Sequence, residues 1–373
     1  MISPGNCAEL IVDKLKAKKT TVILYLGFNG FIEHKRGVEN VIAFQAKACP
    51  ELVKMYVYFG EKNEVYRWNN IICISIRKTH FRFLDLNFLV FYLYNKYERI
   101  LIHSHNYLMS FFILKRINLM TVHDALYYQV KCLNRNFKFI FKLIELAVYR
   151  KTSLIHFISS FAKSQSLLKS GSSFVVIPNT SHLEQMIQLN SETPSSPILD
   201  NESYVFSVRS IEERAGIDLL IDVAEQYQLK GERLKFLVAG KGPMLEHYKK
   251  EIIDRGIKNI FMLGYVSDNE LVNYYKKCSI VLITAKYAEG FGLPIIEGYL
   301  FNRPVIASNV CAIPEVIFDT SFLFENKIQS IIAKIDSVLR LQDKNYRKFY
   351  LENFSNYIII SRFDNLYNSF LNN

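Results

Sequence analysis

This sequence lacks long apolar runs and closely spaced cysteines. In 373 residues, none of the apolar stretches reaches the roughly 18 uninterrupted residues of a membrane-spanning helix, and the nearest, 83–94, is broken by Asp85 and Asn87. The six cysteines show no spacing typical of disulfides or metal sites, so we expect reduced thiols. Residues 1–19 form a lysine-containing leader without the pattern of a signal peptide. These absences favour a globular, cytoplasmic protein.

Internal repeats and low-complexity tracts are also absent, and the length exceeds that of one ordinary hydrophobic core. Short β-branched runs alternate with helical stretches, which is typical of an α/β fold with parallel sheets. A stretch rich in Ser and Pro interrupts the alternation at 189–202. We therefore predict two doubly wound, Rossmann-like domains that face a cleft, at 1–188 and 203–345, with 189–202 as the linker.

Positive charge is concentrated in the first half. Of 46 basic and 35 acidic residues, 25 and 12 lie in 1–188, which leaves 21 and 23 for 189–373. The excess is densest at 77–151, where 13 basic and 16 aromatic residues accompany four acidic ones. Such a segment predicts an anionic partner, either a membrane surface or a pyrophosphate-linked acceptor. Nucleic acid is not expected, because the sequence contains no recognised module for it. Alternatively, these aromatic residues form a core and the charges are merely solvated.

Two carboxylates stand close together in segment 288–298. The β-branched run 279–284 predicts a buried strand, and Pro294 suits the first turn of a helix. Glu289 then lies on a glycine loop, and Glu297 in the first helical turn. In open α/β sheets, ligands bind beyond the strand ends, where helix N-termini attract phosphate. We expect phosphate to meet backbone N–H groups here, and sugar hydroxyls to donate to the carboxylates.

Three basic residues follow other predicted strands. Arg209 comes directly after the run 204–208, and Arg214 five residues later. Because the planar guanidinium matches phosphate oxygens, the two arginines are a candidate diphosphate clamp. Lys241 lies in the glycine loop 239–243, which lacks the third glycine of a dinucleotide fingerprint. For each of the three, a solvated loop charge is the alternative.

The second half resembles the family 4 retaining glycosyltransferases, which have the two-domain GT-B fold. The resemblance covers 204–318 and rests on an ordered series of motifs. The series reads Val208-Arg-Ser-Ile-Glu-Glu-Arg-Ala-Gly, Val238-Ala-Gly-Lys-Gly-Pro, Leu263-Gly-Tyr-Val-Ser-Asp, Glu289-Gly-Phe-Gly-Leu-Pro-Ile-Ile-Glu, Arg303-Pro-Val-Ile-Ala-Ser and Ile313-Pro-Glu-Val-Ile.

The first half follows the same plan less closely. Arg36-Gly-Val-Glu, Thr121-Val-His-Asp and Val176-Ile-Pro-Asn stand where the family pattern has its motifs. The tail 346–373 is similar to the family's closing segment, so the resemblance implies that it packs back on the first domain.

The resemblance implies a role for each matching residue. Glu289 would hold donor-sugar hydroxyls, Glu297 the ribose hydroxyls, and Arg209 the diphosphate of the departing nucleotide. His123 would lie under the donor sugar, although a His-Asp pair at a strand end can also be structural. The other implied donor-binding residues are Gly37, Arg214, Lys241, Gly290, Phe291, Gly292 and Leu293.

Three departures from the family pattern concern the phosphate contacts. Ala215 replaces a basic residue, Cys311 and Ala312 replace paired glycines, and Thr180 replaces a glycine. The binding of phosphate therefore depends on whether Arg214 supplies the missing charge.

The predicted activity is transfer without a metal or other cofactor. Many transferases hold a metal with an Asp-x-Asp pair, which this sequence lacks, and arginine with a helix N-terminus can do the same electrostatic work. Metal binding by His103 and His105, which flank Ser104, is not favoured.

We expect a retaining hexosyltransferase that uses a UDP- or GDP-sugar. Its acceptor would be a hydroxyl of a lipid-linked glycan for O-antigen, capsule or exopolysaccharide. We expect it in the cytoplasm, peripherally bound at the inner face of the plasma membrane. The alternatives are a nucleotide-sugar-binding protein without turnover, a sugar-nucleotide epimerase, and a glycosyltransferase that makes a soluble product.

Overall fold

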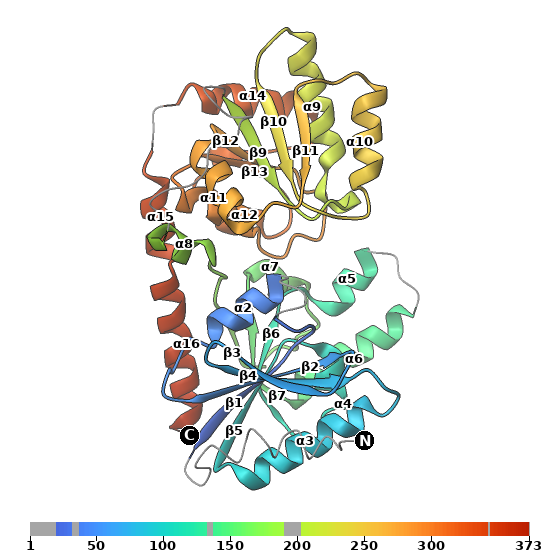
Figure 1. Ribbon diagram of the computed structural model, residues 1–373, viewed down its shortest axis with the longest axis vertical. Helices are drawn as coiled ribbons and strands as arrows, with labels where there is room; N and C mark the ends of the chain where they lie inside the picture. Colours follow the sequence, from blue (N-terminus) through green and yellow to red (C-terminus); the bar gives the residue numbers. More distant parts are fainter. Residues whose placement is uncertain (1–19, 32–36, 133–136, 190–202, 342–343, 373) are drawn as a thin grey trace. The chain divides into compact units, whose positions relative to one another are not determined.

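The computed structural model describes residues 20–31, 37–132, 137–189, 203–341 and 344–372, which form two compact units (Figure 1). The first unit contains the residues up to Pro178 and those from Ile359 onward; the second runs from Asn179 to Ile358. Leu189 ends a helix of the second unit. The leader 1–19 and the rest of the predicted linker, 190–202, lie outside the described residues.

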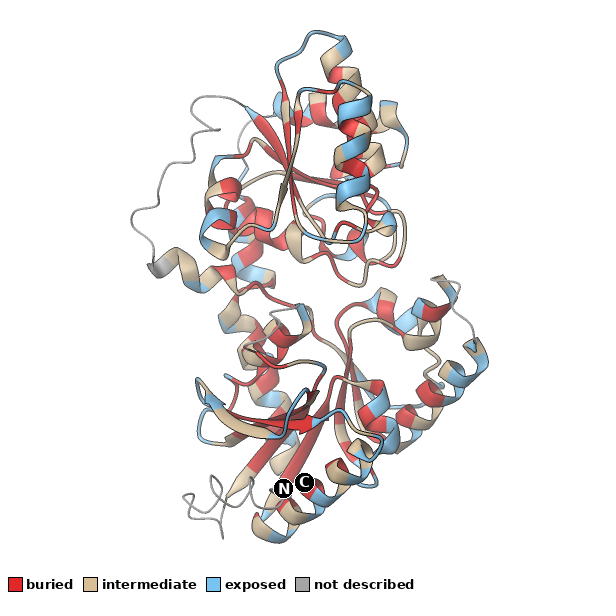
Figure 2. Ribbon diagram, turned by 45° about the vertical axis from the view of Figure 1, so that its right-hand side comes forward, coloured by how far each residue is buried: buried red, intermediate tan, exposed pale blue. Residues whose placement is uncertain are grey.

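The first unit is built on a sheet with the strand order β3-β4-β2-β1-β5-β6-β7-β8. All neighbours pair in parallel except β3 and β4, which are antiparallel. The strands are β1 (Thr21–Leu26), β2 (Val53–Gly60), β3 (Glu64–Trp68), β4 (Ile71–Arg77), β5 (Arg99–Ser104), β6 (Ile117–Val122), β7 (Thr152–Phe157) and β8 (Phe174–Val176). The β-branched runs form the interior strands because a parallel sheet is covered on both faces (Figure 2).

The helices of the first unit include long connections and short turns. They are α2 (Gly37–Gln45), α3 (Arg82–Lys96), α4 (Tyr107–Phe112), α5 (Leu126–Cys132), α6 (Lys138–Lys151), α7 (Ser160–Gln165) and α16 (Asn356–Leu371), of which α16 belongs to this unit from Ile359 onward.

The second unit has a parallel sheet with the strand order β11-β10-β9-β12-β13-β14. The strands are β9 (Tyr204–Val208), β10 (Lys235–Ala239), β11 (Ile260–Gly264), β12 (Ile280–Ile283), β13 (Val305–Ser308) and β14 (Leu323–Phe324). The helices are α8 (Leu183–Leu189), α9 (Ile217–Leu229), α10 (Leu245–Asp254), α11 (Asp268–Lys277), α12 (Leu293–Leu300), α13 (Ile313–Val316), α14 (Ile328–Leu339) and α15 (Tyr346–Asn353), with 3-10 turns at 213–215 and 320–322. Helices α9 and α10 lie on one side of the sheet, and α11 and α12 on the other (Figure 1).

Each sheet contains one point where the strand order reverses. In the first unit, β1 lies between β2 and β5; in the second, β9 lies between β10 and β12. The loops that leave neighbouring strands in opposite directions open a crevice at such a point, where ligands of α/β proteins bind. The predicted α/β class with two doubly wound sheets is confirmed. None of the helices within the described residues is long and apolar enough to cross a bilayer.

The tail 346–373, which we expected on the first domain, divides between the two units. Helix α15 packs on α12 of the second unit, where the rings of Tyr346 and Tyr299 stack with centroids 6.0 Å apart. The hydroxyl of Thr180, which stands where the family has glycine, donates to Oδ1 of Asn356 at 2.8 Å and shares a hydrogen bond of 3.2 Å with the Tyr350 hydroxyl. In the first unit, Asp364 of α16 accepts a hydrogen bond from the backbone of residue 49 at 2.6 Å. Both parts of the tail are therefore fixed by polar contacts inside a unit.

A chain of hydrogen bonds crosses the interior of the first unit. It connects buried side chains of β1, α16, β5, β6 and β7, and it ends on a backbone carbonyl. Successive partners lie 2.9, 2.8, 2.7, 2.9 and 2.8 Å apart, in the order Tyr25, Tyr367, His103, Thr121, His156 and Ile177.

The chemistry of the last partner sets the direction of the whole chain. The Ile177 carbonyl can only accept, so Nε2 of His156 donates, and in the neutral imidazole Nδ1 accepts from the Thr121 hydroxyl. Thr121 then accepts from Nε2 of His103, whose Nδ1 accepts from Tyr367. Both imidazoles are neutral in this arrangement, because burial lowers the pKa of His156 to about 4 and that of His103 well below its usual value.

Candidate functional site

The reversal point of the second sheet brings Arg209 and Glu289 together. Arg209 follows β9 directly, and Glu289 lies in the loop after β12. Nη2 of Arg209 donates to Oε2 of Glu289 at 2.5 Å, and the two side chains are only 7% and 17% exposed. Within the described part of the chain, the buried Nη1 of Arg209 has no hydrogen-bond partner. The site thus holds a buried cationic donor with capacity for one more acceptor.

A glycine next to Arg209 is required by a close backbone approach. The Arg209 N–H donates to the Ala239 carbonyl at 3.0 Å. A Cβ atom at Gly240, whose φ is 141°, would lie 1.7 Å from the Arg209 carbonyl oxygen. Lys241, the next residue, is exposed, and its ammonium lies 4.7 Å from the ring centroid of Tyr265. The glycine loop therefore positions Arg209, while Lys241 contacts an aromatic ring at the surface.

Arg214 connects the loops that follow β9 and β12. Its Nε donates to Oε2 of Glu212 at 2.9 Å, and its Nη1 donates to the Ala288 carbonyl at 2.8 Å. Burial would raise the pKa of Glu212, but hydrogen bonds from Arg214 and Ser210 outweigh it, and the net shift is downward. Ala215, which replaces a basic residue, is 1% exposed. In this structure Arg214 thus braces the loop that carries Glu289.

Glu297 lies in the second turn of its helix, not in the first as the sequence predicts. The reason is that Gly292 adopts a left-handed conformation, with φ 94°, and α12 begins at Leu293. Glu297 is 6% exposed, and burial raises its pKa. Its Oε1 accepts from the Ser181 hydroxyl at 3.1 Å and its Oε2 from Tyr275 at 2.9 Å. Both carboxylate oxygens are therefore bound inside the unit.

The remaining residues of the 288–293 loop shape the N-terminus of α12. Phe291 is buried, while Gly290 and Leu293 are partly exposed. The Glu289 carbonyl accepts from the Ala312 N–H at 3.2 Å. Cys311, in place of a family glycine, keeps the left-handed conformation with φ 54°. Cys311 therefore has the backbone conformation that a glycine would adopt at this position without strain.

In the first unit, His123 lies at the end of β6 and pairs with His105. Its Nε2 is 2.9 Å from Nδ1 of His105, and among the described residues the buried Nε2 of His105 has no partner. Burial, with a smaller effect of His156, lowers the pKa of His123 to about 3, so its imidazole is neutral near pH 7. His105 is absent from the predicted donor site. The sequence does contain one feature that points to His105: it directly follows the run that forms β5, at the reversal point of the first sheet.

A pocket of about 350 Å³ lies beside this histidine pair. Its lining includes Phe28, Val38, His105, His123 and Asp124. The described residues contain no group of three or more His, Cys, Asp or Glu side chains arranged to hold a metal ion. Gly37, at the start of α2, is exposed, and a Cβ there would meet nothing within 4 Å. Arg36, which precedes it in the motif, lies outside the described residues.

Comparison with known proteins identifies the second unit. Residues 190–353 match the family described as Glycosyl transferases group 1. The second unit carries a group 1 glycosyltransferase domain. Arg209, Glu289 and Glu297 all belong to this glycosyltransferase domain, whereas His123 and Gly37 belong to the first unit. Membership of family 4 in particular stays a prediction.

Two relatives of this glycosyltransferase domain are named for an O-antigen chain and for poly(ribitol phosphate). O-antigen chain mannosyltransferase C of Escherichia coli is 26% identical over 178 residues, which are 46% of this chain and 43% of that protein. Poly(ribitol-phosphate) alpha-N-acetylglucosaminyltransferase of Staphylococcus aureus (strain COL) is 30% identical over 170 residues, which are 41% and 33% of the two chains. The chain thus spans less than half the length of the curated relatives it matches.

A solved structure extends the likeness of the fold to both units. Anabaena Alr3699/HepE, in complex with UDP and glucose, has a TM-score of 0.70 and 17% identity, over 93% of this chain and 99% of that chain. This match confirms the predicted GT-B-like fold, in which the glycosyltransferase domain is the second of two Rossmann-like units.

Proposed function

We propose that this protein transfers a hexose, with retention of configuration, from a nucleoside diphosphate sugar to a hydroxyl of a glycan. The observation that carries the proposal is the buried Arg209–Glu289 pair at the reversal point of a group 1 glycosyltransferase domain. A departing nucleoside diphosphate develops negative charge, and a fixed donor stabilises it best where water is excluded. The available Nη1 of Arg209 is such a donor.

Each residue in the proposal acts through a contact it can make. Arg209 binds the diphosphate, and the N-terminus of α12 adds N–H groups and the positive end of the helix dipole. Glu289 accepts hydrogen bonds from donor-sugar hydroxyls. The imidazole of His123, in the first unit, is neutral near pH 7, so we assign the positive charge to arginine. Because arginine and the helix supply that charge, the proposal includes no metal and no other cofactor.

The acceptor and cellular site follow from the relatives and from the charge of the chain. The names of the two relatives refer to an O-antigen chain and to poly(ribitol phosphate). We propose a lipid-linked glycan of O-antigen, capsule or exopolysaccharide synthesis as acceptor. The donor would be a UDP- or GDP-sugar, and the Anabaena structure with UDP and glucose supports UDP among these. The enzyme would work in the cytoplasm, at the inner face of the plasma membrane.

A donor panel tests the proposal. We expect one of the UDP-, GDP- and ADP-sugars to raise the melting temperature by several degrees, because a ligand at about 100 times its Kd adds about 2.7 kcal/mol to the free energy of unfolding. The same donor should yield labelled glycan when a lipid-linked acceptor extract is added. If no nucleotide sugar in the panel shifts the melting temperature, the proposal fails.

A nucleotide-sugar-binding protein without turnover is the second candidate. Ala215 in place of a basic residue favours it, together with the engagement of Arg214 by Glu212 and Ala288. Only one of two expected arginines would then reach the diphosphate. Saturable binding of a donor, with neither hydrolysis nor transfer to any acceptor, would favour this candidate over the transferase.

We further propose that the first unit binds an anionic membrane through what we term the α3–α4–α6 surface. Its large apolar side chains are exposed, with Phe88 at 70% and Leu114 at 86%. On α3 they recur every three or four residues, so this helix is apolar on its outer face as well as its inner one. The surface consists of Phe81, Leu84, Phe88, Phe91, Leu108, Phe111, Phe112, Leu114, Phe137, Phe139, Ile140 and Leu143.

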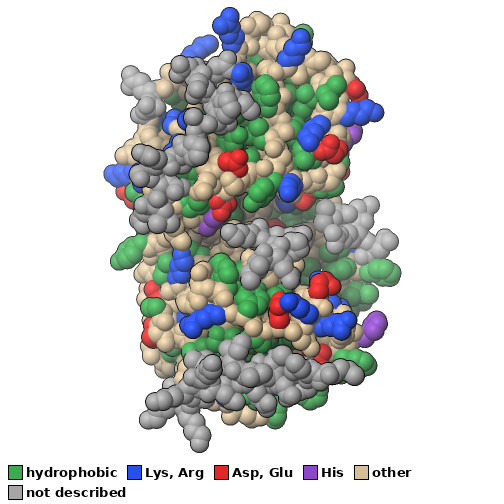
Figure 3. Space-filling model, viewed as in Figure 1, with side chains coloured by type: hydrophobic (Ala, Val, Ile, Leu, Met, Phe, Trp, Pro, Cys, Tyr) green, Lys and Arg blue, Asp and Glu red, His purple; other side chains and the backbone are tan. Residues whose placement is uncertain are grey.

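The three helices form one continuous surface. The Asn87 side chain of α3 donates to the Phe112 carbonyl at 3.0 Å and accepts from the Leu114 N–H at 2.7 Å. Helix α4 packs on α6, and Lys151 at the end of α6 donates to the Phe111 carbonyl at 3.1 Å. Exposed basic residues lie in the same segments, at Lys115, Arg116, Lys142 and Arg150, and Lys138 is partly exposed. On the first unit, hydrophobic side chains reach the surface beside Lys and Arg (Figure 3).

Apolar side chains bordered by cations match the interface of an anionic bilayer. In sedimentation with phosphatidylglycerol vesicles, Phe88→Ser combined with Phe91→Ser should weaken binding about tenfold or more. The reason is that two phenyl groups are no longer transferred from water into the bilayer. The control is Leu229→Ser with Ile253→Ser, which changes two equally exposed side chains of the second unit. Binding should also fall at high salt. Equal vesicle binding by both double variants would contradict the membrane proposal.

A further inference from the structure

A second pocket of the first unit, of about 490 Å³, combines positive charge with aromatic walls and a carboxylate. We name it the Lys78–Arg82 pocket. It lies beyond the ends of β1, β2 and β4, and its volume is in the range of small-molecule sites. Its lining includes Phe28, Asn29, Glu39, Phe59, Lys78 and Arg82.

The cationic side of the pocket follows from two residues after β4. Lys78 comes directly after this strand, and Arg82 is the first residue of α3. The Arg82 guanidinium lies 5.7 Å from the ring centroid of Phe59 and 5.0 Å from that of Phe83, which limits its movement. The Lys78 ammonium is 3.4 Å from the exposed Glu61 carboxylate, a weak pairing in water. Nη1 of Arg82 also donates to the Thr79 carbonyl at 3.4 Å, so its other N–H groups and the Lys78 ammonium are the donors for an anion in the pocket.

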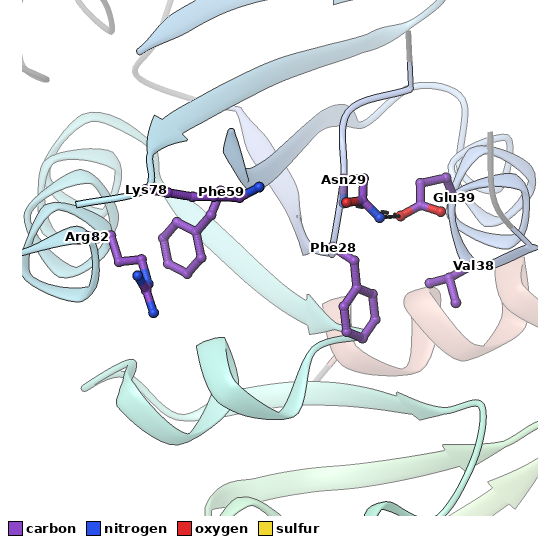
Figure 4. Close-up of a pocket in the computed structure, with 7 residues that line it drawn as sticks. All are labelled: Phe28, Asn29, Val38, Glu39, Phe59, Lys78 and Arg82. Carbon is purple, nitrogen blue, oxygen red and sulfur yellow. Dashed lines mark hydrogen bonds between the residues drawn. The ribbon is translucent and has the colours of Figure 1, made fainter. Parts of the chain in front are cut away.

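The opposite side of the pocket is polar and fixed. Oε1 of Glu39 accepts from the Asn29 N–H at 3.2 Å and from the Asn29 amide at 3.3 Å. Glu39 is 1% exposed, and its Oε2 has no hydrogen-bond partner among the residues that the structure describes. Figure 4 shows the Asn29–Glu39 pair on one side, Lys78 and Arg82 on the other, and the Phe28 ring between them. A ligand that suits both sides has an anionic group next to hydroxyl donors.

The pocket adjoins the histidine pair and the α3–α4–α6 surface. Phe28 and Val38 line both this pocket and the one that contains His123. In the other direction, Phe81, which is 68% exposed, stands between Lys78 and Arg82 in the sequence and begins the apolar face of α3. The pocket thus lies between the His105–His123 pair and the α3–α4–α6 surface.

We propose that the Lys78–Arg82 pocket binds a phosphate group of the acceptor, which is a glycosyl phosphate or diphosphate. The inference rests on the proposed transferase function and specifies the chemistry of its acceptor. Lys78 and Arg82 bind the phosphate oxygens with charge-assisted hydrogen bonds. The rings of Phe28 and Phe59 cover apolar sugar faces, and the Asn29–Glu39 pair faces the hydroxyls. The phosphate thereby directs the sugar toward His123 and the lipid toward the apolar surface.

Binding of hexose 1-phosphate to the full chain tests this pocket. The titration is followed by ligand-observed NMR with UDP in excess, which keeps the probe out of the donor site. Lys78→Gln combined with Arg82→Gln should weaken binding about a hundredfold, because each of the two lost charge-assisted hydrogen bonds costs about tenfold. The control is Lys163→Gln with Lys169→Gln, which removes the same charge from exposed positions of the same unit. It should bind within about twofold of the wild type.

Parallel probes distinguish the sources of the phosphate. If inorganic phosphate binds as tightly as hexose 1-phosphate, the acceptor assignment is overturned. It is also overturned if the pocket variant binds phosphatidylglycerol vesicles more weakly but binds hexose 1-phosphate as the wild type does. Equal binding of hexose 1-phosphate by both double variants overturns it as well. Arg82→Lys, which keeps the charge, should retain binding within a few-fold, and melting curves verify that each variant is folded. Failure of all nucleotide sugars to stabilise the wild type would instead reject the transferase function alone.

Discussion

Replacement of Arg209 by Met is expected to lower kcat/KM for sugar transfer about 10²–10³-fold, the usual loss when a fixed donor to a developing anion is removed. The physical reason is the position of the guanidinium. It is almost fully buried, one nitrogen binds Glu289, and the other has no partner among the described residues. Steady-state kinetics with the donor found in the nucleotide-sugar panel provide the measurement, and the loss should appear in kcat because the charge develops in the transition state.

Two further variants separate this role from a purely structural one. Arg209→Met leaves the Glu289 carboxylate without its partner, which also lowers stability. Combining it with Glu289→Gln removes that unpaired charge, so we expect the melting temperature to recover while transfer stays lost. Arg347→Met, at an exposed position of the same unit, should leave the melting temperature and the rate of transfer unchanged. Near wild-type kcat/KM in Arg209→Met would remove arginine from the proposed mechanism.

Thr121→Val is expected to lower the free energy of unfolding by about 2–4 kcal/mol, although it barely changes the size of the side chain. The Thr121 hydroxyl donates to His156 and accepts from His103, so its loss leaves two buried nitrogens unpaired. Each unsatisfied buried group costs about 1–3 kcal/mol. For a unit of this size, the melting temperature should fall by roughly 5–15 °C.

Thr152→Val is the matched control for this substitution. Thr152 is also buried in the first unit, but its hydroxyl makes a single hydrogen bond, to the Val148 carbonyl at 2.7 Å. We expect a loss of about 1 kcal/mol there. Thermal unfolding followed by circular dichroism compares the two variants. Should Thr121→Val prove no more destabilising than Thr152→Val, the hydrogen-bond chain would not contribute to stability as described.

The strands that carry the site could be predicted from the sequence because their signal is local. The runs that became β9 and β12 are short, apolar and contain β-branched residues, and loops with charged residues and glycines follow them. Their carboxyl ends had to meet at one edge of a parallel sheet. By contrast, β3 escaped prediction, because the alternation in Glu64–Trp68 is that of a half-exposed strand with two charges. Among the described strands, it lies at the edge of the sheet and pairs with β4 alone.

The partners within the site could not be predicted, because they are chosen by tertiary structure. Arg209 and Glu289 both stand out in the sequence, yet nothing there indicates that they bind each other across 80 positions. The same holds for Glu297, whose oxygens are taken by Ser181 and Tyr275. A residue pattern identifies acids and bases at strand ends; which of them are already paired depends on how the loops pack.

The discontinuity of the first unit has a consequence for biosynthesis. Tyr367, which bonds to Tyr25 and His103, is translated after the entire second unit. Until it emerges from the ribosome, the hydroxyl of Tyr25 and Nδ1 of His103 have no partner in the chain of hydrogen bonds. The first half of the nascent polypeptide therefore keeps unpaired polar groups in its interior until the glycosyltransferase domain has been synthesised. The order of synthesis runs from the first unit to the second, but the first unit can complete its core only last.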